Sequence, residues 1–162
     1  MLVVHCLVIG ARSGRHRMKE KWLKYFCNVA EQTAQLSTAT KLKVGCVIVK
    51  DNRILSIGYN GTPAGWDNEC ETLINHGDIG TTTLLTKPEV LHAEANALMK
   101  LCKSTESSCG ATLFITHTPC IDCAKLIFQA GIENVYCINE YKARKGEGAP
   151  FLKKAGVNLI YV

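Results

Sequence analysis

The 162-residue sequence predicts an α/β fold in which helices cover the faces of one sheet. Helical and strand-like segments alternate along the chain in the order α-β-β-α-β-α-β-α-β, which is typical of this class. The length suits one domain that can bury most of its apolar surface. A content of 47% hydrophobic and 20% charged residues is ordinary for a soluble globular protein.

The first predicted helix covers residues 18–37, where apolar side chains recur at helical spacing. These side chains belong to Trp22, Phe26, Val29, Ala30 and Leu36. Residues 43–50 are rich in β-branched side chains and predict a strand. Residues 51–53 predict a turn into a second strand over residues 54–60, so the two strands form a hairpin.

The middle of the chain predicts a loop, a helix and a third strand. Glycine and proline punctuate residues 61–69, which predict the loop. Residues 70–90 have weak periodicity and predict an irregular excursion. Residues 91–102 have the alanine and leucine content of a helix, and residues 111–116 have the alternation of a strand.

The last part of the chain predicts two helices and two strands. A helix is expected over residues 119–131, because Pro119 suits a first turn and Gly131 suits a C-cap. A strand over 134–138, a short helix over 149–156 and a strand over 157–162 complete the order.

Residues 1–17 are interpreted as an N-terminal extension of unknown role, and residues 18–162 as the single functional domain. The apolar stretch MLVVHCLVIG is about ten residues long, too short to span a bilayer. It also lacks the basic region and a clear cleavage site of a signal peptide. The sequence therefore predicts no membrane partner.

Net charge bears on the ligand, and cysteine content on the cellular compartment. The net charge of +5 suits an anionic ligand such as a nucleotide, although a solvated surface explains it equally well. Residues 12–17 and 142–148 are locally basic. Nine irregularly spaced cysteines do not resemble the framework of a small secreted domain. We therefore expect mostly free, buried thiols in a reducing compartment, the cytoplasm.

Three residues in two separate segments predict a catalytic zinc site. Cys120 and Cys123 share one face of a helical first turn, where the positive helix end favours thiolates. His92 stands at the start of the preceding helix and can converge on them. Three protein ligands leave the fourth tetrahedral position open for water, as in catalytic rather than structural zinc sites.

Glu94 lies two residues after His92, close enough to approach a metal-activated water without binding the metal. A neighbouring carboxylate can take the proton of such a water and deliver it elsewhere. The pattern H-x-E with P-C-x-x-C is the known signature of zinc deaminases.

Two other interpretations of the paired cysteines are weaker. A redox dithiol would not need the upstream H-x-E pattern. A structural zinc site would need a fourth ligand, and the sequence offers candidates. Among them, Cys102 and Cys137 are expected to be buried small hydrophobes, and His117 is expected to face solvent or neighbouring backbone. The remaining candidate is Cys109.

From about residue 22 onward the chain resembles the deoxycytidylate (dCMP) deaminases of the cytidine deaminase superfamily. The resemblance rests on VGCVIVKD, GYNGTPAG, HAEANALM and TPCIDCAKLIFQAGI, which occur in the family's order. It implies a three-layer α/β/α sandwich around a mixed five-stranded sheet, commonly assembled into homo-oligomers that are hexamers.

The resemblance implies the following site roles. His92, Cys120 and Cys123 bind Zn²⁺, and Glu94 carries the proton from water to N3 during hydrolysis at C4 of dCMP. The products are dUMP, a precursor of thymidylate, and ammonia. The backbone N–H of Ala93 is available to orient the base and water, because the first N–H groups of a helix lack intrahelical partners.

Three further substrate contacts are expected from the resemblance. Asn60 matches an asparagine that contacts the sugar, although an Asn-Gly turn also explains it. Tyr141 matches a tyrosine near the 5′-phosphate, although it suits an amphipathic surface equally. Lys43 occupies a basic family position that could reach the phosphate, although an exposed lysine at a strand start is as plausible.

The resemblance also raises regulation and a second metal. Many family members respond to dCTP and dTTP near the loop that contains Asn60 and Gly61, and both residues are present. Some phage members hold a structural zinc, but here only Cys70 and His76 remain as remnants of that site. We therefore do not expect a second zinc.

Other functions remain open at the level of the sequence. One is deamination of dCTP or of a modified cytosine nucleotide. Another is a non-catalytic deaminase-like subunit that binds nucleotides, against which Glu94 argues, because pure binding does not need a carboxylate there. A nucleic-acid partner is not expected, since no long basic segment with interleaved aromatic residues is present.

Overall fold

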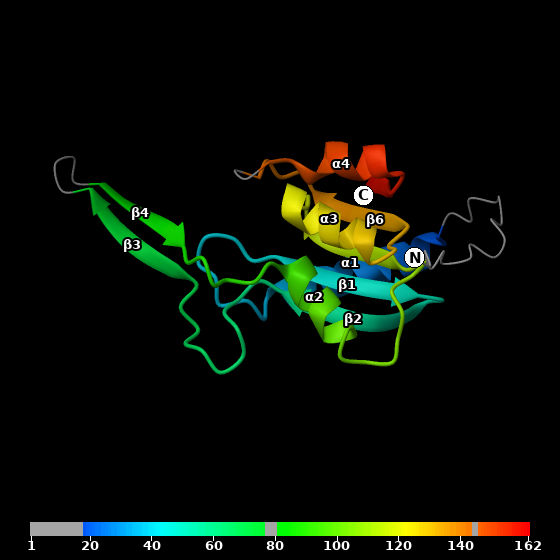
Figure 1. The fold of residues 1–162 in the computed structure, drawn as a ribbon, viewed down its shortest axis with the longest axis horizontal. Helices are drawn as coiled ribbons and strands as arrows, with labels where there is room; N and C mark the ends of the chain where they lie inside the picture. The colour runs from blue at the N-terminus through cyan, green and yellow to red at the C-terminus, as the bar shows by residue number, and fades with distance from the viewer. Residues whose placement is uncertain (1–17, 77–80, 144–145) are drawn as a thin grey trace, which may run out of the picture.

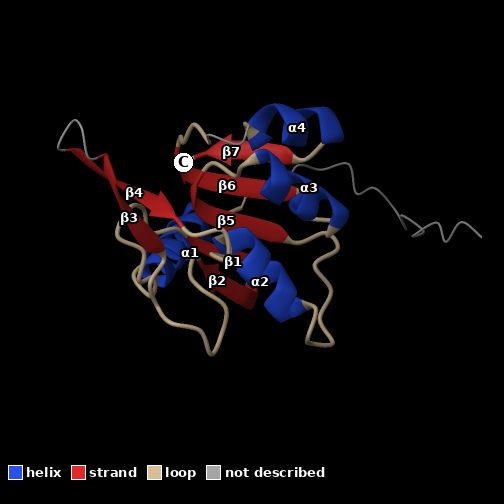
Figure 2. Cartoon of the chain, turned by 60° about the vertical axis from the view of Figure 1, so that its left-hand side comes forward, coloured by secondary structure: helices blue, strands red, loops and turns tan. Residues whose placement is uncertain are grey.

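The computed structural model describes residues 18–76, 81–143 and 146–162; the extension predicted over residues 1–17 lies outside them. The central sheet has the strand order β2-β1-β5-β6-β7 (Figure 2). Its strands are β1 (Gly45–Lys50), β2 (Arg53–Tyr59), β5 (Thr112–His117), β6 (Asn134–Asn139) and β7 (Asn158–Tyr161). β1 pairs antiparallel with β2 and β5, whereas β6 pairs parallel with β5 and β7. The predicted mixed five-stranded sheet is confirmed.

Helices cover both faces of this sheet. They are α1 (Glu20–Ala34), α2 (Ala93–Leu101), α3 (Ile121–Gln129) and α4 (Gly148–Ala155). Within the described ranges, no helix has the length and apolar character needed to cross a bilayer. Alternate residues of β1 point to opposite faces: Val47 packs with Phe26 of α1, whereas Ile48 packs in a separate cluster with Ala97 of α2 and Ala124 of α3. The predicted three-layer sandwich is confirmed.

The turn between β1 and β2 shows how local sequence sets this hairpin. Asp51 and Asn52 both adopt positive φ angles, of 51° and 58°. Two central residues with positive φ form the type I′ turn, whose twist matches that of the flanking strands. Aspartate and asparagine tolerate this conformation better than most residues. The predicted hairpin therefore forms where the sequence places it.

The prediction that residues 70–90 are irregular is wrong. β3 (Glu71–His76) and β4 (Thr81–Thr86) pair antiparallel along their whole length. Figure 1 shows this hairpin projecting away from the five-stranded sheet. Nearly all of its side chains are exposed. Because neither face of the ribbon is buried, the sequence lacks the apolar–polar alternation by which strands are recognised.

A close approach of α2 to β2 positions the start of α2. A side chain at Gly58 would collide with the backbone of Ala93 and Ala97, so α2 can pack directly on the strand only because this residue is glycine. The buried hydroxyl of Ser56 donates a hydrogen bond of 2.7 Å to the carbonyl of Ala97. The first turn of α2 is thereby held against the sheet.

Gly58→Ala is expected to reduce the free energy of unfolding by about 1–3 kcal/mol, because the added methyl group overpacks the contact between β2 and α2. Urea unfolding measures the change. The control is Gly61→Ala, whose added Cβ would meet only the ring of Tyr59, at 3.7 Å. Equal unfolding midpoints for the two variants would show that the approach of α2 is not constrained at Gly58.

Candidate metal centre and adjoining cavity

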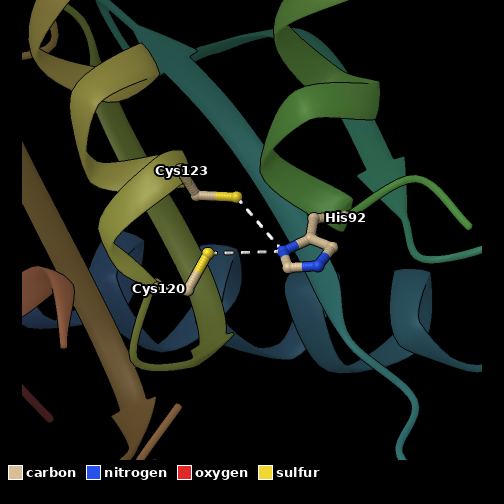
Figure 3. Close-up of side chains that lie close together, drawn as sticks. All are labelled: His92, Cys120 and Cys123. Carbon is tan, nitrogen blue, oxygen red and sulfur yellow. Dashed lines mark hydrogen bonds between the residues drawn. The ribbon is translucent and has the colours of Figure 1, made fainter. Parts of the chain in front are cut away.

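The amino ends of α2 and α3 bring three potential metal ligands together. His92 immediately precedes α2, Cys120 immediately precedes α3, and Cys123 lies in the first turn of α3. Figure 3 shows both sulfur atoms pointing toward the imidazole ring. The first N–H groups of each helix lack intrahelical partners, so both helix ends favour negative charge in the space between them.

The distances between these side chains fit a zinc ion. Nδ1 of His92 lies 3.5 Å from Sγ of Cys120 and 3.3 Å from Sγ of Cys123. All three ligand atoms lie within 4.8 Å of one another. Tetrahedral zinc, with bonds of about 2.3 Å to sulfur and about 2.0 Å to nitrogen, holds these two ligand types about 3.5 Å apart. The predicted three-residue site is therefore brought together in suitable geometry.

The thiol of Cys120 loses its proton more readily than an ordinary cysteine thiol. The pKa of Cys120 is lowered to about 4, chiefly because the Cys123 thiol donates a hydrogen bond to it, with His92 adding to the effect. The same bond keeps the proton on Cys123 and, together with burial, raises the pKa of that thiol. Thiolates are the form that binds zinc.

Glu94 lies beside the ligands but outside the group that could hold the metal. Its side chain is buried, with 4% of the residue exposed. Burial raises the pKa of this carboxyl group, although its own backbone N–H, His92 and a hydrogen bond from Cys123 oppose the rise. A carboxyl group with a raised pKa can both accept and donate a proton near neutral pH.

The structure does not supply a fourth protein ligand from the sequence candidates. Cys102 and Cys109 are exposed, so the expectation that Cys102 is buried is wrong. Cys137 is buried as expected, and its thiol donates to the carbonyl of Asn139 at 3.2 Å. Among the described residues, the group able to hold a metal contains only the three predicted ligands. This arrangement favours a catalytic over a structural site.

The segment before α3 is fixed by the start of α4. The N–H of Gly148 donates to the carbonyl of Pro119 at 3.1 Å, and the N–H of Ile121 donates to the carbonyl of Gly146 at 3.1 Å. A side chain at Gly148 would collide with the backbone of Pro119 and Cys120. Backbone contact therefore holds Cys120 in place.

A cavity of about 320 Å³ adjoins the three ligands. This volume is at the lower end of the range for small-molecule sites. Its wall is formed by residues from the segments 41–44, 85–94, 117–120 and 141–143, together with Asn60. The lining residues are Lys41, Leu42, Val44, Asn60, Leu85, Thr86, Lys87, Pro88, Val90, His92, Ala93, Glu94, His117, Thr118, Cys120, Tyr141 and Ala143.

Asn60 lines this cavity and organises its wall. Its side-chain Oδ1 accepts a hydrogen bond from the N–H of Val44 at 2.8 Å, and its Nδ2 donates to the carbonyl of Leu42 at 2.8 Å. The following Gly61 forms two backbone hydrogen bonds with Leu91, of 2.8 and 3.1 Å, next to His92. The predicted sugar contact of Asn60 stays a prediction, because its side chain also has this structural use.

The other predicted substrate contacts are only partly brought together. Ala93 is buried and Tyr141 is half exposed, and both line the cavity. Lys43 is exposed and is not among the lining residues. Lys41 and Lys87 provide the lysine side chains of the described wall instead. The sequence did not distinguish these lysines from the others.

His117 is a cavity residue that sequence reasoning missed. It was expected to face solvent or neighbouring backbone, yet it lines the cavity, and Nδ1 lies 3.0 Å from the hydroxyl of Thr116. Its ring meets the ring of Tyr141 edge to face, with centroids 6.0 Å apart. Partial burial lowers the pKa of His117, which favours the neutral ring. Its place two residues before Pro119, beside the metal ligands, was the available signal.

The two remnants of a possible second metal site lie apart from this centre. Cys70 is buried, with its sulfur 3.4 Å from the hydroxyl of Thr38. His76 is exposed on the β3–β4 hairpin, where Nε2 lies 3.2 Å from the hydroxyl of Thr83. Neither residue belongs to the group described around His92.

The chain is similar to known zinc deaminases over most of its length. Residues 20–139 match the family model of the cytidine and deoxycytidylate deaminase zinc-binding region. A deoxycytidylate deaminase of Mycobacterium phage D29 is 40% identical over 119 residues, which cover 70% of this chain and 91% of that protein. ComE operon protein 2 of Bacillus subtilis is 37% identical over 145 residues, covering 87% and 71% of the two chains.

A solved structure extends the similarity to three dimensions. The dCMP deaminase from the cyanophage S-TIM5, crystallised in complex with dCMP and dUMP, matches with a TM-score of 0.78 and 43% sequence identity. The match covers 90% of this chain and 99% of that one. It supports the three-layer architecture.

Cys123→Ser is expected to lower zinc affinity by about 100-fold or more, because it removes one of three protein ligands. Metal analysis after dialysis against a weak chelator measures bound zinc per chain. Cys102→Ser removes an exposed cysteine outside the group and should retain as much zinc as the unmodified protein. Equal retention by both variants would contradict the assigned ligand set.

Proposed function

The chain belongs to the zinc-binding family of cytidine and deoxycytidylate deaminases, and from this premise we propose that it hydrolyses dCMP to dUMP and ammonia. The observation that carries the proposal is the buried carboxyl group of Glu94 beside three metal ligands in the wall of a cavity. Phage proteins of the same family that are named as dCMP deaminases align with most of the chain. The product would supply thymidylate synthesis.

His92, Cys120 and Cys123 would hold the zinc ion. When bound, zinc lowers the pKa of a coordinated water to about 7 and supplies a nucleophile at neutral pH. Glu94 can accept one proton from the attacking water and pass it to N3 of the cytosine ring as the oxygen adds at C4. It can then take the second proton, from the new hydroxyl group, to the amino nitrogen, so that the bond from C4 to this nitrogen breaks, the carbonyl forms at C4 and ammonia leaves.

The remaining wall residues are suited to orient the nucleotide. The half-buried ring of His117 and the ring of Tyr141 provide flat surfaces against which a base or sugar can pack. The N–H of Ala93, in the first turn of α2, provides a donor near the base. Asn60 has one further hydrogen and one further lone pair for the sugar. We keep Lys43 as a weaker candidate for the phosphate, because it does not line the cavity.

Two alternatives remain. The substrate could be dCTP or a modified cytosine nucleotide, since the same metal centre would act on any of them. The chain could also be a non-catalytic nucleotide-binding subunit, and its similarity to ComE operon protein 2 keeps that interpretation open. Glu94 favours an enzyme, because a buried carboxyl group is costly unless it has a function or a partner.

We further propose regulation by dCTP and dTTP through the loop that contains Asn60 and Gly61. The paired backbone of Gly61 and Leu91 supports this, because it links the loop to the residue before His92. Exposed apolar side chains on the projecting hairpin, Leu73 and Leu85 among them, support assembly into a homo-oligomer, proposed as a hexamer. The eight free cysteines described support a cytoplasmic location.

Zinc-loaded protein should deaminate dCMP in preference to dCTP, deoxycytidine and CMP. Ammonia release and the accompanying ultraviolet change measure turnover, with and without dCTP as an effector. Turnover of dCTP in place of dCMP would change the substrate assignment. Zinc-loaded protein that turns over none of the four would support the binding-subunit alternative.

Glu94→Gln is expected to keep one zinc per chain and to lower kcat by about 10²–10⁴-fold, because the amide cannot carry the proton. The matched control is Glu133→Gln, which changes an exposed carboxylate that does not line the cavity. Zinc analysis and ammonia release are measured on the same samples. A zinc-loaded Glu94→Gln protein with unchanged kcat would exclude the proton-shuttle role.

A further inference from the structure

Lys87 is the more buried of the two lysines that line the cavity. Its side chain is 19% exposed, and its Nζ lies 3.7 Å from a carboxylate oxygen of Asp67 and 3.5 Å from one of Glu69. The backbone N–H of Lys87 donates to the carbonyl of Cys70 at 2.9 Å, which anchors the residue at the base of the hairpin. Lys87 therefore lines the cavity while its ammonium group lies near two carboxylates.

The two carboxylates near this group are exposed and lie outside the cavity wall. The side chains of Asp67 and Glu69 are 69% and 78% exposed, and neither residue lines the cavity. Both belong to the loop that begins at Gly61, and the N–H of Glu69 donates to Oδ1 of Asp67 at 3.2 Å. An anion that enters the cavity and contacts Lys87 must therefore approach two negative charges.

The balance of charge changes with the number of phosphates. Lys41, which is exposed, is the second lysine among the described residues that line the cavity. The two positive charges of Lys41 and Lys87 equal the two negative charges of the carboxylates. A phosphate oxygen in contact with Nζ, at about 2.8 Å, would lie within about 6.5 Å of the carboxylate oxygens. That separation is shorter than the screening length of about 8 Å at physiological ionic strength.

We propose that Lys87, Asp67 and Glu69 determine how many phosphates the substrate carries, so that the site accepts a nucleoside monophosphate and disfavours a triphosphate. Lys87 pairs with one phosphate. Each additional phosphate adds negative charge near Asp67 and Glu69 without a further cation in the described wall to pair with it. This inference rests on the proposed function, since it concerns the phosphate of the same nucleotide.

The double variant Asp67→Asn, Glu69→Gln tests the carboxylates. The ratio of kcat/KM for dCTP to that for dCMP should rise about tenfold at low ionic strength, because two repulsive charges are removed. The rise should shrink at high salt, and kcat/KM for deoxycytidine should not change. An unchanged ratio would overturn the role of the carboxylates.

A control variant removes a surface carboxylate away from the cavity. Glu106 pairs with Arg53 at 2.7 Å on the surface and does not line the cavity. Glu106→Gln should leave the ratio of dCTP to dCMP unchanged. Because this control removes one charge and the double variant removes two, a rise of about half the size on a logarithmic scale would show that the total charge of the protein, and not the position of Asp67 and Glu69, sets the preference.

Lys87→Met tests the cation. It should raise KM for dCMP about tenfold or more, with a smaller change in kcat, and should leave deoxycytidine unaffected. Lys87→Arg should restore most of the affinity. Equal losses for dCMP and deoxycytidine in the Met variant would indicate a structural role of Lys87 and overturn its assignment to the phosphate.

Binding measurements separate this inference from the proposed function. Calorimetric titration of zinc-loaded Glu94→Gln protein with dCMP and dCTP needs no turnover. Tighter binding of dCMP than of dCTP, with a smaller difference between the two when Asp67→Asn and Glu69→Gln are added, would support the inference even if no nucleotide is deaminated. Deamination of dCMP with equal binding of dCMP and dCTP would overturn the inference and leave the proposed function standing.

Discussion

The direct contact between α2 and β2 at Gly58 is the constraint on which the metal centre depends. It leaves no room for a side chain and so fixes the first turn of α2 and the adjoining His92. Gly148 has the same effect for Cys120, because the start of α4 touches the backbone before α3. Backbone packing, rather than flexible side chains, therefore sets the distance between the imidazole and the thiols. Sites supported in this way hold their ligands with little adjustment on binding.

The same arrangement divides the centre into a buried half and an accessible half. Cys120, Cys123 and Glu94 are buried, whereas His92 is exposed beside the cavity. Burial raises the pKa of Glu94. The positive ends of α2 and α3 favour the thiolate form of the cysteines. A molecule in the cavity therefore lies beside both the three potential metal ligands and the carboxyl group of Glu94. The same packing positions the metal ligands and the group proposed as the proton carrier.

The sheet, its helices and the metal ligands were predictable because they depend on periodicity and on spacing within short segments. The hairpin in residues 70–90 was not, since strands exposed on both faces leave no burial pattern. Lys87 comes directly after that hairpin, and its place in the cavity wall was not predicted for the same reason. Lys41 lines the cavity and Lys43 does not. Both lie in an irregular segment whose backbone is held by hydrogen bonds from Asn60, in a distant part of the chain. Such long-range contacts have no local signature in one sequence.

X-ray absorption spectroscopy of the zinc-loaded protein tests the central claim most directly, because it counts ligands without requiring a substrate. The three-ligand centre predicts two sulfur ligands at about 2.3 Å, one imidazole nitrogen at about 2.0 Å and one additional light atom from solvent. A third sulfur ligand or a second imidazole would indicate a closed structural site. That result would contradict the assignment of His92, Cys120 and Cys123 as an open catalytic centre.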